Sequence, residues 1–313
     1  MTMRPSVRPQ EGVCAEPTIH SWTLLLDVVS DDVAALQGLL LRFPSLVDSL
    51  SARFSEANLN VVLAIGAEYW PILAPDSEPP SGLKSIETNT VGEFALPQTH
   101  ADFALICRAD RLDANYFAVR VMLEWFGDLV IVQDDIQGFR YLDGRDLFGF
   151  RIDPDMPHGN LRRELAYVAG HDSLYAGGSY LCLQRVQVNL KRWEQLSVEQ
   201  QREIMGREKV SGQPWPTALP NHAEKSARGA LALWRVQMPL ANVQTGGEMV
   251  LHWSRDLADI EAYVQQRFGA IANEQETVSA DPLLAYEQVI KNAVFFAPAR
   301  NWFERLASES AGR

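Results

Sequence analysis

The feature that most constrains the fold is an order of strand and helix patterns that occurs twice along the 313 residues. In the first copy, runs rich in apolar and β-branched residues, which are typical of strands, alternate with amphipathic patterns typical of helices. The expected strands are 18–29, 59–66, 101–109 and 129–133, and the expected helices are 30–54, interrupted at Pro44, and 110–126. This β-α-β-β-α-β order is the ferredoxin-like pattern.

The second copy begins with GSYLCLQRVQVNL (178–190), where side chains alternate cleanly between two faces of a strand. Ser197 and Gln200 have the spacing of a capping box, which opens a helix through Arg207. The remaining elements are strands at 230–237, 248–253 and 293–297 and a helix at 256–268. A sheet that is covered by helices on one face buries its other face against a second sheet. The sequence therefore predicts an α+β protein whose two ferredoxin-like halves pack together.

The element order also divides the chain. We expect a flexible N-terminal tail (1–15), a first half (16–137), a connecting loop (138–177), a second half (178–306) and a C-terminal tail (307–313).

Composition excludes several classes of partner. The chain has 40 acidic and 28 basic residues and a net charge of −12, which argues against nucleic acid or an anionic membrane surface as a partner. No apolar run approaches the ~18 residues of a membrane helix, and the N-terminus lacks the apolar region of a secretory signal. The three cysteines, Cys14, Cys107 and Cys182, are far apart and form no metal-binding or c-type haem pattern. This cysteine usage is typical of the reducing cytoplasm.

One stretch departs from regular patterning. In GFRYLDGRDLFGFRIDPDMPHGN (138–160), aromatic residues alternate with charged ones, while Gly144, Gly149 and two prolines interrupt any regular element. The pattern predicts a packed loop with apolar anchors and charges directed to one place. On spacing alone a surface loop held by its aromatics is the simpler interpretation, although packed loops often carry function.

The same stretch resembles the segment of dye-decolourising haem peroxidases that leads into their distal haem loop. HADFALICRADRLD (100–113), AGGSYLCLQRVQVNLKRW (176–193) and FFAP (295–298) are also similar to that family, and the resemblance extends over about 10–306. It implies the dimeric α+β barrel of these peroxidases, in which two ferredoxin-like halves form one barrel. It also implies haem b as the cofactor.

An axial ligand for haem has six candidates: His20, His100, His158, His171, His222 and His252. On spacing alone each is typical of a structural or solvent-exposed histidine. The family's axial histidine occupies the loop before the strand that carries the distal arginine, and His222 matches that position. The resemblance therefore implies His222 as the iron ligand.

On the distal side, Arg235 in ALWRVQMPLAN resembles the family's distal arginine, which stabilises charge on the departing oxygen. Without the resemblance, an arginine that pairs with a carboxylate on a strand face is the simpler interpretation. Gln237 stands where a shorter amide or hydroxyl is usual. The family's distal aspartate falls on Ile152. Asp153 is the candidate replacement, but Pro154 restricts its backbone, so we expect its carboxylate to face solvent or Arg151.

The resemblance implies further contacts to the haem. Phe150, Arg151, Ile152 and Phe296 are expected to line it, together with His222 and Arg235. Some relatives place a carboxylate beside the axial imidazole, and that position is Ala285 here, with Glu287 two residues further on. We therefore expect an imidazole without a carboxylate partner, which disfavours high-valent iron.

Taken together, these features predict peroxide-dependent one-electron oxidation by a b-type haem protein, with weak activity because Ile152 replaces the distal acid. The expected partners are a small organic substrate and hydrogen peroxide, and a homo-oligomer is allowed. Three alternatives stay open: a haem enzyme of this fold repurposed for N–O or dehydration chemistry, a non-catalytic haem carrier, and a relative that has lost haem.

Overall fold

The structure is a computed structural model that describes residues 7–86, 94, 96–170, 174–269, 271–273, 276–277 and 279–310; the side chains of 271–273, 276–277 and 307–310 are outside this description. The first half contains β1 (His20–Val28), α1 (Val33–Leu40), α2 (Phe43–Arg53), β2 (Asn60–Gly66), α3 (Trp70–Leu73), β3 (Phe103–Ala109), α4 (Leu112–Phe126) and β4 (Val130–Phe139). The predicted order of strands and helices is confirmed for this half.

The second half repeats the order with additional short helices. The connecting segment contains α5 (Asn160–Ala166). The elements that follow are β5 (Ser179–Val188), α6 (Leu190–Trp193), α7 (Val198–Met205), α8 (His222–Lys225), β6 (Trp234–Ala241), β7 (Gly246–Ser254), α9 (Leu257–Phe268), the small strands β8 (Ile271–Asn273) and β9 (Glu276–Thr277), β10 (Glu287–Ala297) and α10 (Arg300–Ser310). Short 3₁₀ turns lie at Glu11–Cys14, Ser55–Ala57, Gly127–Leu129 and Pro282–Ala285.

Local sequence explains several element boundaries. The Ser197–Gln200 capping box forms as predicted, and the helix that it opens ends at Met205, two residues before the predicted end. The predicted break at Pro44 lies slightly earlier, because Pro44 occupies the first turn of α2. Proline is tolerated there since the first backbone N–H groups of a helix have no acceptor within it.

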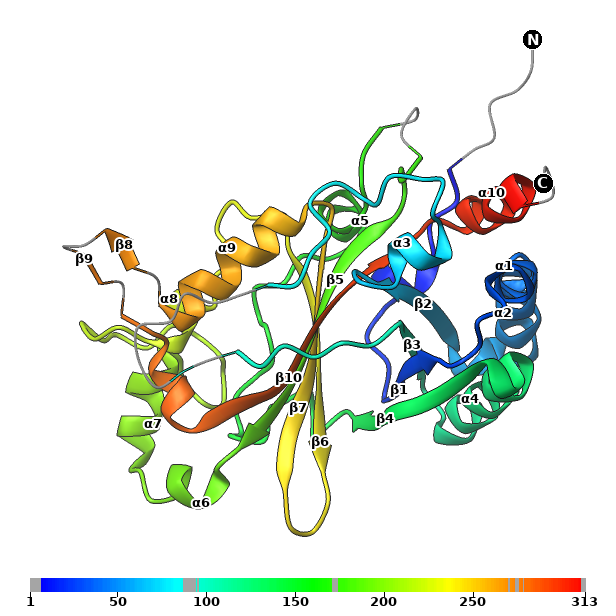
Figure 1. Cartoon of the computed structure of the whole chain (residues 1–313). Coiled ribbons are helices and arrows are strands. Elements are labelled where there is room, and N and C mark those ends of the chain that lie inside the picture. The colour runs from blue at the N-terminus through cyan, green and yellow to red at the C-terminus, as the bar shows by residue number, and fades with distance from the viewer. Residues whose placement is uncertain are drawn as a thin grey trace.

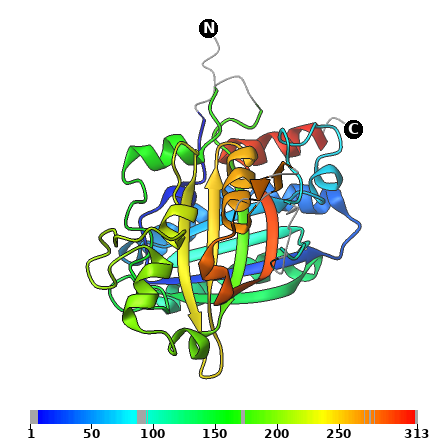
Figure 2. The ribbon, with the colours of Figure 1, turned by 90° about the vertical axis from the view of Figure 1, so that its left-hand side faces the viewer.

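The two halves form one continuous sheet that folds over on itself. The strand order is β4-β1-β3-β2-β10-β5-β7-β6, and the halves are joined by the short antiparallel pairing of β10 with β2. Figure 2 shows the strands of the second half running across those of the first. The interior between the layers is apolar, with Leu25, Ile106, Leu181 and Phe295 among its fully buried side chains.

The two outer strands approach each other at Gly138. A Cβ atom at this position would lie only 2.9 Å from the Cβ of Met238 on β6, so glycine allows β4 and β6 to come close and the sheet to approach a closed barrel. Helices cover the outer faces: α1, α2 and α4 lie outside the first half, and α9 lies outside the second (Figure 1).

Two predicted tails are partly wrong. Gln10 is buried, and its side-chain amide donates to the carbonyl oxygen of Leu63 and accepts from the backbone N–H of Leu63. Val13 is also fully buried. This part of the N-terminus is therefore packed against β2. At the other end, α10 continues to Ser310, into the predicted C-terminal tail.

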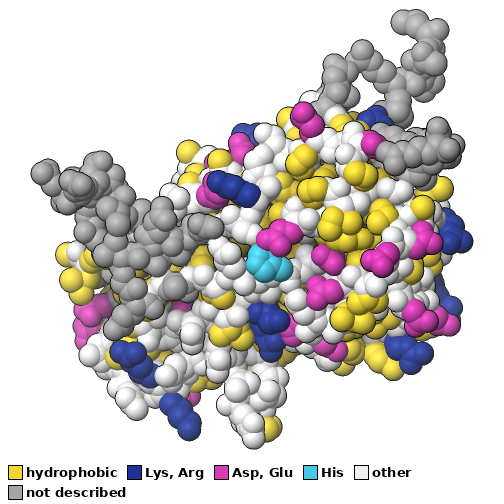
Figure 3. Space-filling model, viewed as in Figure 1, with side chains coloured by type: hydrophobic (Ala, Val, Ile, Leu, Met, Phe, Trp, Pro, Cys, Tyr) yellow, Lys and Arg dark blue, Asp and Glu magenta, His cyan; other side chains and the backbone are white. Residues whose placement is uncertain are grey.

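The surface agrees with the acidic composition. Lys and Arg side chains form separate spots on the face in Figure 3. Within the described part of the chain, no single helix is long and apolar enough to cross a membrane; only the bent pair of α1 and α2 reaches that length and composition together.

Candidate functional site

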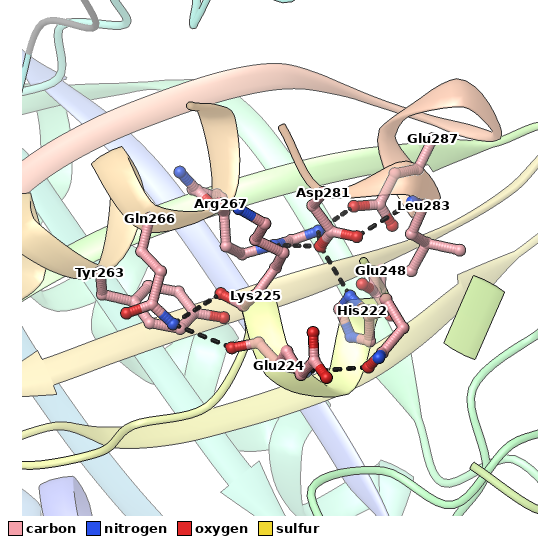
Figure 4. Close-up of polar contacts among 12 residues, drawn as sticks. His222, Glu224, Lys225, Glu248, Tyr263, Gln266, Arg267, Asp281, Leu283 and Glu287 are labelled. Carbon is pink, nitrogen blue, oxygen red and sulfur yellow. Dashed lines mark hydrogen bonds and ion pairs between the residues drawn. The ribbon is translucent and has the colours of Figure 1, made fainter. Parts of the chain in front are cut away.

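His222 is the first residue of α8, a single helical turn that lies beside α9. Asn221 caps this turn by accepting a hydrogen bond from the N–H of Glu224 at 3.0 Å. Gln266 of α9 donates to the carbonyl oxygens of Glu224 and Lys225 at 3.1 and 3.0 Å (Figure 4). Two elements distant in sequence thus hold the backbone of His222 in place.

The imidazole of His222 has a buried carboxylate partner. Its Nδ1 lies 2.7 Å from Oδ2 of Asp281, whose side chain is fully buried. The prediction of an imidazole without such a partner is wrong, because it considered Ala285 and overlooked the aspartate four residues earlier. Burial lowers the pKa of His222, but the charge and hydrogen bond of Asp281 raise it, and the net shift is upward. Within the described residues, no hydrogen bond reaches the other ring nitrogen, Nε2.

Arg267 links this pair to a second carboxylate. From the last turn of α9, its Nε donates to Oδ2 of Asp281 at 2.9 Å, and its guanidinium also pairs with Glu287 at the start of β10. Although burial raises the pKa of Asp281, the charges of His222 and Arg267 lower it well below its ordinary value. The four side chains form one chain of ion pairs, His222–Asp281–Arg267–Glu287, which we call the buried ion network (Figure 4).

Arg235 and Asp153 line the same pocket as His222. The guanidinium of Arg235 on β6 binds Asp153 through both carboxylate oxygens, with Nε to Oδ2 at 2.6 Å, and also donates to the hydroxyl of Tyr263. The prediction that Asp153 faces solvent or Arg151 is therefore wrong. Asp153 adopts a φ of +40°, a left-handed conformation that is uncommon for non-glycine residues and that clusters at functional sites.

Gln237 and Glu248 extend the polar wall. Gln237 on β6 donates to the carboxylate of Glu248 on β7. Only 8% of Glu248 is exposed. Burial raises the pKa of Glu248 to about 8, and repulsion from Glu287 and Asp146 acts in the same direction.

These residues surround two adjoining cavities. The outer pocket, about 250 Å³, is lined by His222, Arg235, Gln237, Ile152, Asp153 and the turn after α8. The inner pocket lies deeper, holds only about 20 Å³, and is lined by His222, Arg235, Glu248, His252, Arg267 and Glu287. The structure thus brings His222, Arg235, Asp153, Gln237 and Ile152 together. An open imidazole nitrogen can bind a metal, a guanidinium can stabilise an anion, and a carboxylate beside it can transfer a proton.

Two of the predicted lining residues lie elsewhere. Phe150 packs against Trp193 with ring centroids 6.2 Å apart, and its neighbour Phe148 lines the inner pocket instead. Phe296 packs against Trp70 and Tyr180 in the core. Neither ring lines the outer or the inner pocket: Phe150 shares an apolar cluster with Phe148 and Leu283, which do line the inner pocket, and Phe296 lies in the main core. Arg151 does line the outer pocket.

The other histidines occupy different environments. His100 pairs with Glu68 at 2.8 Å on the surface, and His20 lies on β1. His158 lines a cavity of about 530 Å³ that adjoins the outer pocket and shares Ile152, Asp153, Arg235 and Gln237 with it. His252 is buried on β7, and its Nε2 lies 3.3 Å from Oε1 of Gln184. His171 lies outside the described residues.

Sequence reasoning missed Asp281, Arg267 and Glu248. For Arg267 a pattern was available, because the helical spacing from Ile260 and Val264 places position 267 on the buried stripe of α9. A charged residue on such a stripe indicates a buried ion pair. Asp281 and Glu248 gave no comparable pattern, since their partners come from distant elements.

Comparisons with known proteins agree across the whole chain. The family model described as Dyp-type peroxidase, N-terminal, matches residues 10–140, and the model described as Dyp-type peroxidase, C-terminal, matches residues 143–301. The chain is 26% identical to a dye-decolorizing peroxidase of Brevibacterium linens, with 98% of this chain and 85% of that protein covered. It is also 26% identical to one from Mycobacterium tuberculosis, with 96% and 91% covered.

Solved structures agree on the fold. A dye-decolorizing peroxidase from Bacteroides thetaiotaomicron superposes with a TM-score of 0.89 at 22% identity and covers 96% of this chain and 99% of its own. A DypB variant from Rhodococcus jostii, solved in complex with heme, superposes with a TM-score of 0.85 at 22% identity and covers 95% and 97%. The predicted barrel of two ferredoxin-like halves is confirmed.

Proposed function

Because this chain belongs to the Dyp-type peroxidase family, we propose that the pocket between His222 and Arg235 is a haem site and that the protein is a haem-dependent, peroxidase-like oxidoreductase. Both family models match, one for each half. Members of the family are haem peroxidases, and the Rhodococcus jostii relative was solved with heme. The observation that carries the proposal is the geometry of His222.

His222 fits the role of iron ligand. A metal-binding histidine commonly donates its second ring N–H to a carboxylate, which fixes the tautomer and the orientation of the ring. The Nδ1 of His222 lies 2.7 Å from Asp281, which leaves Nε2 as the nitrogen for a metal. About 20% of the side chain is exposed, and it lines the outer pocket.

The space beside His222 fits haem less well than the geometry of the His222 imidazole does. Pockets for ordinary organic ligands measure about 300–1,000 Å³, whereas the outer and inner pockets hold about 250 and 20 Å³. The inner walls carry the buried ion pair of Arg267 and Glu287 and the buried carboxyl group of Glu248. Haem therefore enters only if these long side chains turn away, a change of rotamer that is common at binding surfaces.

The chain's own residues then divide the chemistry. When bound, haem supplies the redox-active iron. Arg235 stabilises negative charge that develops on an oxygen of peroxide, and Asp153, held beside it, accepts and returns the proton. A well-placed acid–base group contributes typically ~10²–10⁴-fold in rate. Because Asp153 is shared with Arg235 and Ile152 is apolar, we expect slow turnover with a small organic electron donor.

A second candidate is a haem-free relative. The buried ion network and the small inner pocket favour it, since both fill space with charge where a flat apolar ring would lie. Under this alternative the outer pocket binds only small ligands.

Hemin titration of the purified protein tests the proposal. We expect a saturable Soret band at one haem per chain, its loss in His222→Ala, and its retention in His100→Ala, a surface histidine that serves as the control. Peroxide-dependent oxidation of a phenol by the loaded protein should disappear in Arg235→Leu and rise in Ile152→Asp. A titration without a saturable band, or a band that persists unchanged in His222→Ala, would contradict the proposal.

A further inference from the structure

Arg267 is the central member of the buried ion network. Its guanidinium bridges Asp281, which also holds His222, and Glu287, which begins β10. In Figure 4 it lies between α9 and these two carboxylates. No more than 6% of Arg267 is exposed, so its charge depends on these partners rather than on water.

The network fills the inner end of the site. Arg267 and Glu287 line the inner pocket together with Glu248, His252 and Tyr263. The remaining void of about 20 Å³ has room for a single water molecule, which needs roughly 10–15 Å³ by the same measure, and not for a macrocycle. Haem cannot lie beside His222 and extend inward while Arg267 and Glu287 keep these positions.

We propose that Arg267 determines which ligands the His222 site admits: its ion pairs hold the inner pocket closed to a flat macrocycle, so that the protein folds without haem and binds it weakly. The inference rests on the proposed function in one respect, since haem is the ligand whose entry is opposed. It goes further by assigning a specificity-determining role to a residue that touches neither the iron position nor peroxide.

The physical reason is that the porphyrin ring offers the displaced carboxylate of Glu287 no substitute partner, whereas the haem propionates could pair only with Arg267. The face of a porphyrin is apolar, whereas a buried guanidinium or carboxylate requires an opposite charge or several hydrogen bonds. Breaking a buried ion pair by removing one partner corresponds to roughly 10²–10³-fold in an equilibrium constant. Replacing both members by uncharged residues of similar volume avoids that penalty, because nothing charged is left without a partner.

The double variant Arg267→Met with Glu287→Gln is the decisive test. It removes one charge of each sign, keeps the lengths of both side chains, and leaves Asp281 to hold His222. We expect the double variant to bind hemin at least 100-fold more tightly than the unmodified protein, measured by the Soret band and by the rise in Tm on adding hemin. The control is Arg300→Met with Asp48→Asn, an ion pair between α10 and α2, which should leave hemin affinity unchanged.

Each outcome separates this inference from the proposed function. Hemin binding that is equally tight or equally weak in the unmodified protein and the double variant overturns the inference. A double variant that is unfolded by circular dichroism is replaced by Arg267→Gln with Glu287→Gln, to which the same expectation applies. Tight loading of the variant without peroxide-dependent turnover supports the inference and contradicts the proposed function. Tight hemin binding and peroxide-dependent turnover by the unmodified protein contradict the inference and support the proposed function.

Discussion

The outer faces of the two half-sheets are built on the same plan but packed with different chemistry. In the first half, Leu24, Leu63 and Leu105 face α1, α2 and α4 in a continuous apolar core. In the second half, the end of the corresponding face nearest α8 carries Arg235 and Glu248 beneath α9. The first face is packed with apolar side chains throughout, whereas the second adds matched charges at one end of the same apolar core.

The difference shows which half can hold a site. Apolar packing is non-directional and tolerates adjustment, whereas a buried charge is stable only when each partner is in place. The carboxylates of Asp281 and Asp153 therefore fix His222 and Arg235 in the lining of one pocket. The buried ion network also fills the inner part of that pocket, so the contacts that orient the site also limit what enters it.

The largest effect is expected from Asp281→Ala, which removes the carboxylate that joins His222 and Arg267 in the buried ion network. It leaves His222 without its partner and Arg267 with one carboxylate instead of two. We expect a loss of ~3–5 kcal/mol in the free energy of unfolding, measured by urea denaturation followed by tryptophan fluorescence. Asp281→Asn keeps an acceptor oxygen and should lose less; a loss below ~1 kcal/mol in Asp281→Ala would remove the contrast between the halves.

The apolar core is tested by Leu63→Ala. Leu63 is fully buried on β2, and the cavity left by such a truncation typically costs about 2–5 kcal/mol. Because no ionisable group is involved, the loss should be the same at pH 5.5 and pH 8. A pH-dependent loss would indicate that the two cores are coupled.

A smaller effect is expected from Glu248→Gln, and it depends on pH. Burial raises the pKa of Glu248 to about 8, so between its ordinary value and pH 8 the folded protein binds a proton that the unfolded chain has released. Stability should therefore fall as pH rises through this window. We expect the unmodified protein to lose about 1–3 kcal/mol between pH 5.5 and 8 relative to Glu248→Gln. Urea midpoints that change with pH in the same way in the two proteins would contradict the raised pKa of Glu248.

The sequence allowed two residues of the site, His222 and Arg235, to be predicted. His222 and Arg235 lie in recognisable motifs on either side of one strand boundary, and the structure places both on the outer pocket. The polar partners of these two residues could not be predicted. Asp281 meets His222 across 59 positions and Asp153 meets Arg235 across 82, and no local pattern encodes contacts at such separations. Neither Phe150 nor Phe296 lines the two pockets, and no local pattern decides this, since an aromatic in a motif packs equally well against a core as against a ligand.

The sequence by itself determined the order of elements in both halves, because hydrophobic periodicity and helix caps act over a few neighbouring residues. Its resemblance to the dye-decolourising peroxidases also indicated His222 and Arg235, which the structure brings into one pocket. Only the tertiary structure decided that Asp281 supports the imidazole, that Asp153 turns to Arg235, and that Arg267 and Glu287 close the inner pocket. These are contacts between side chains brought together by the sheet pairing and by the packing of α9, and their charges become decisive only when water is excluded.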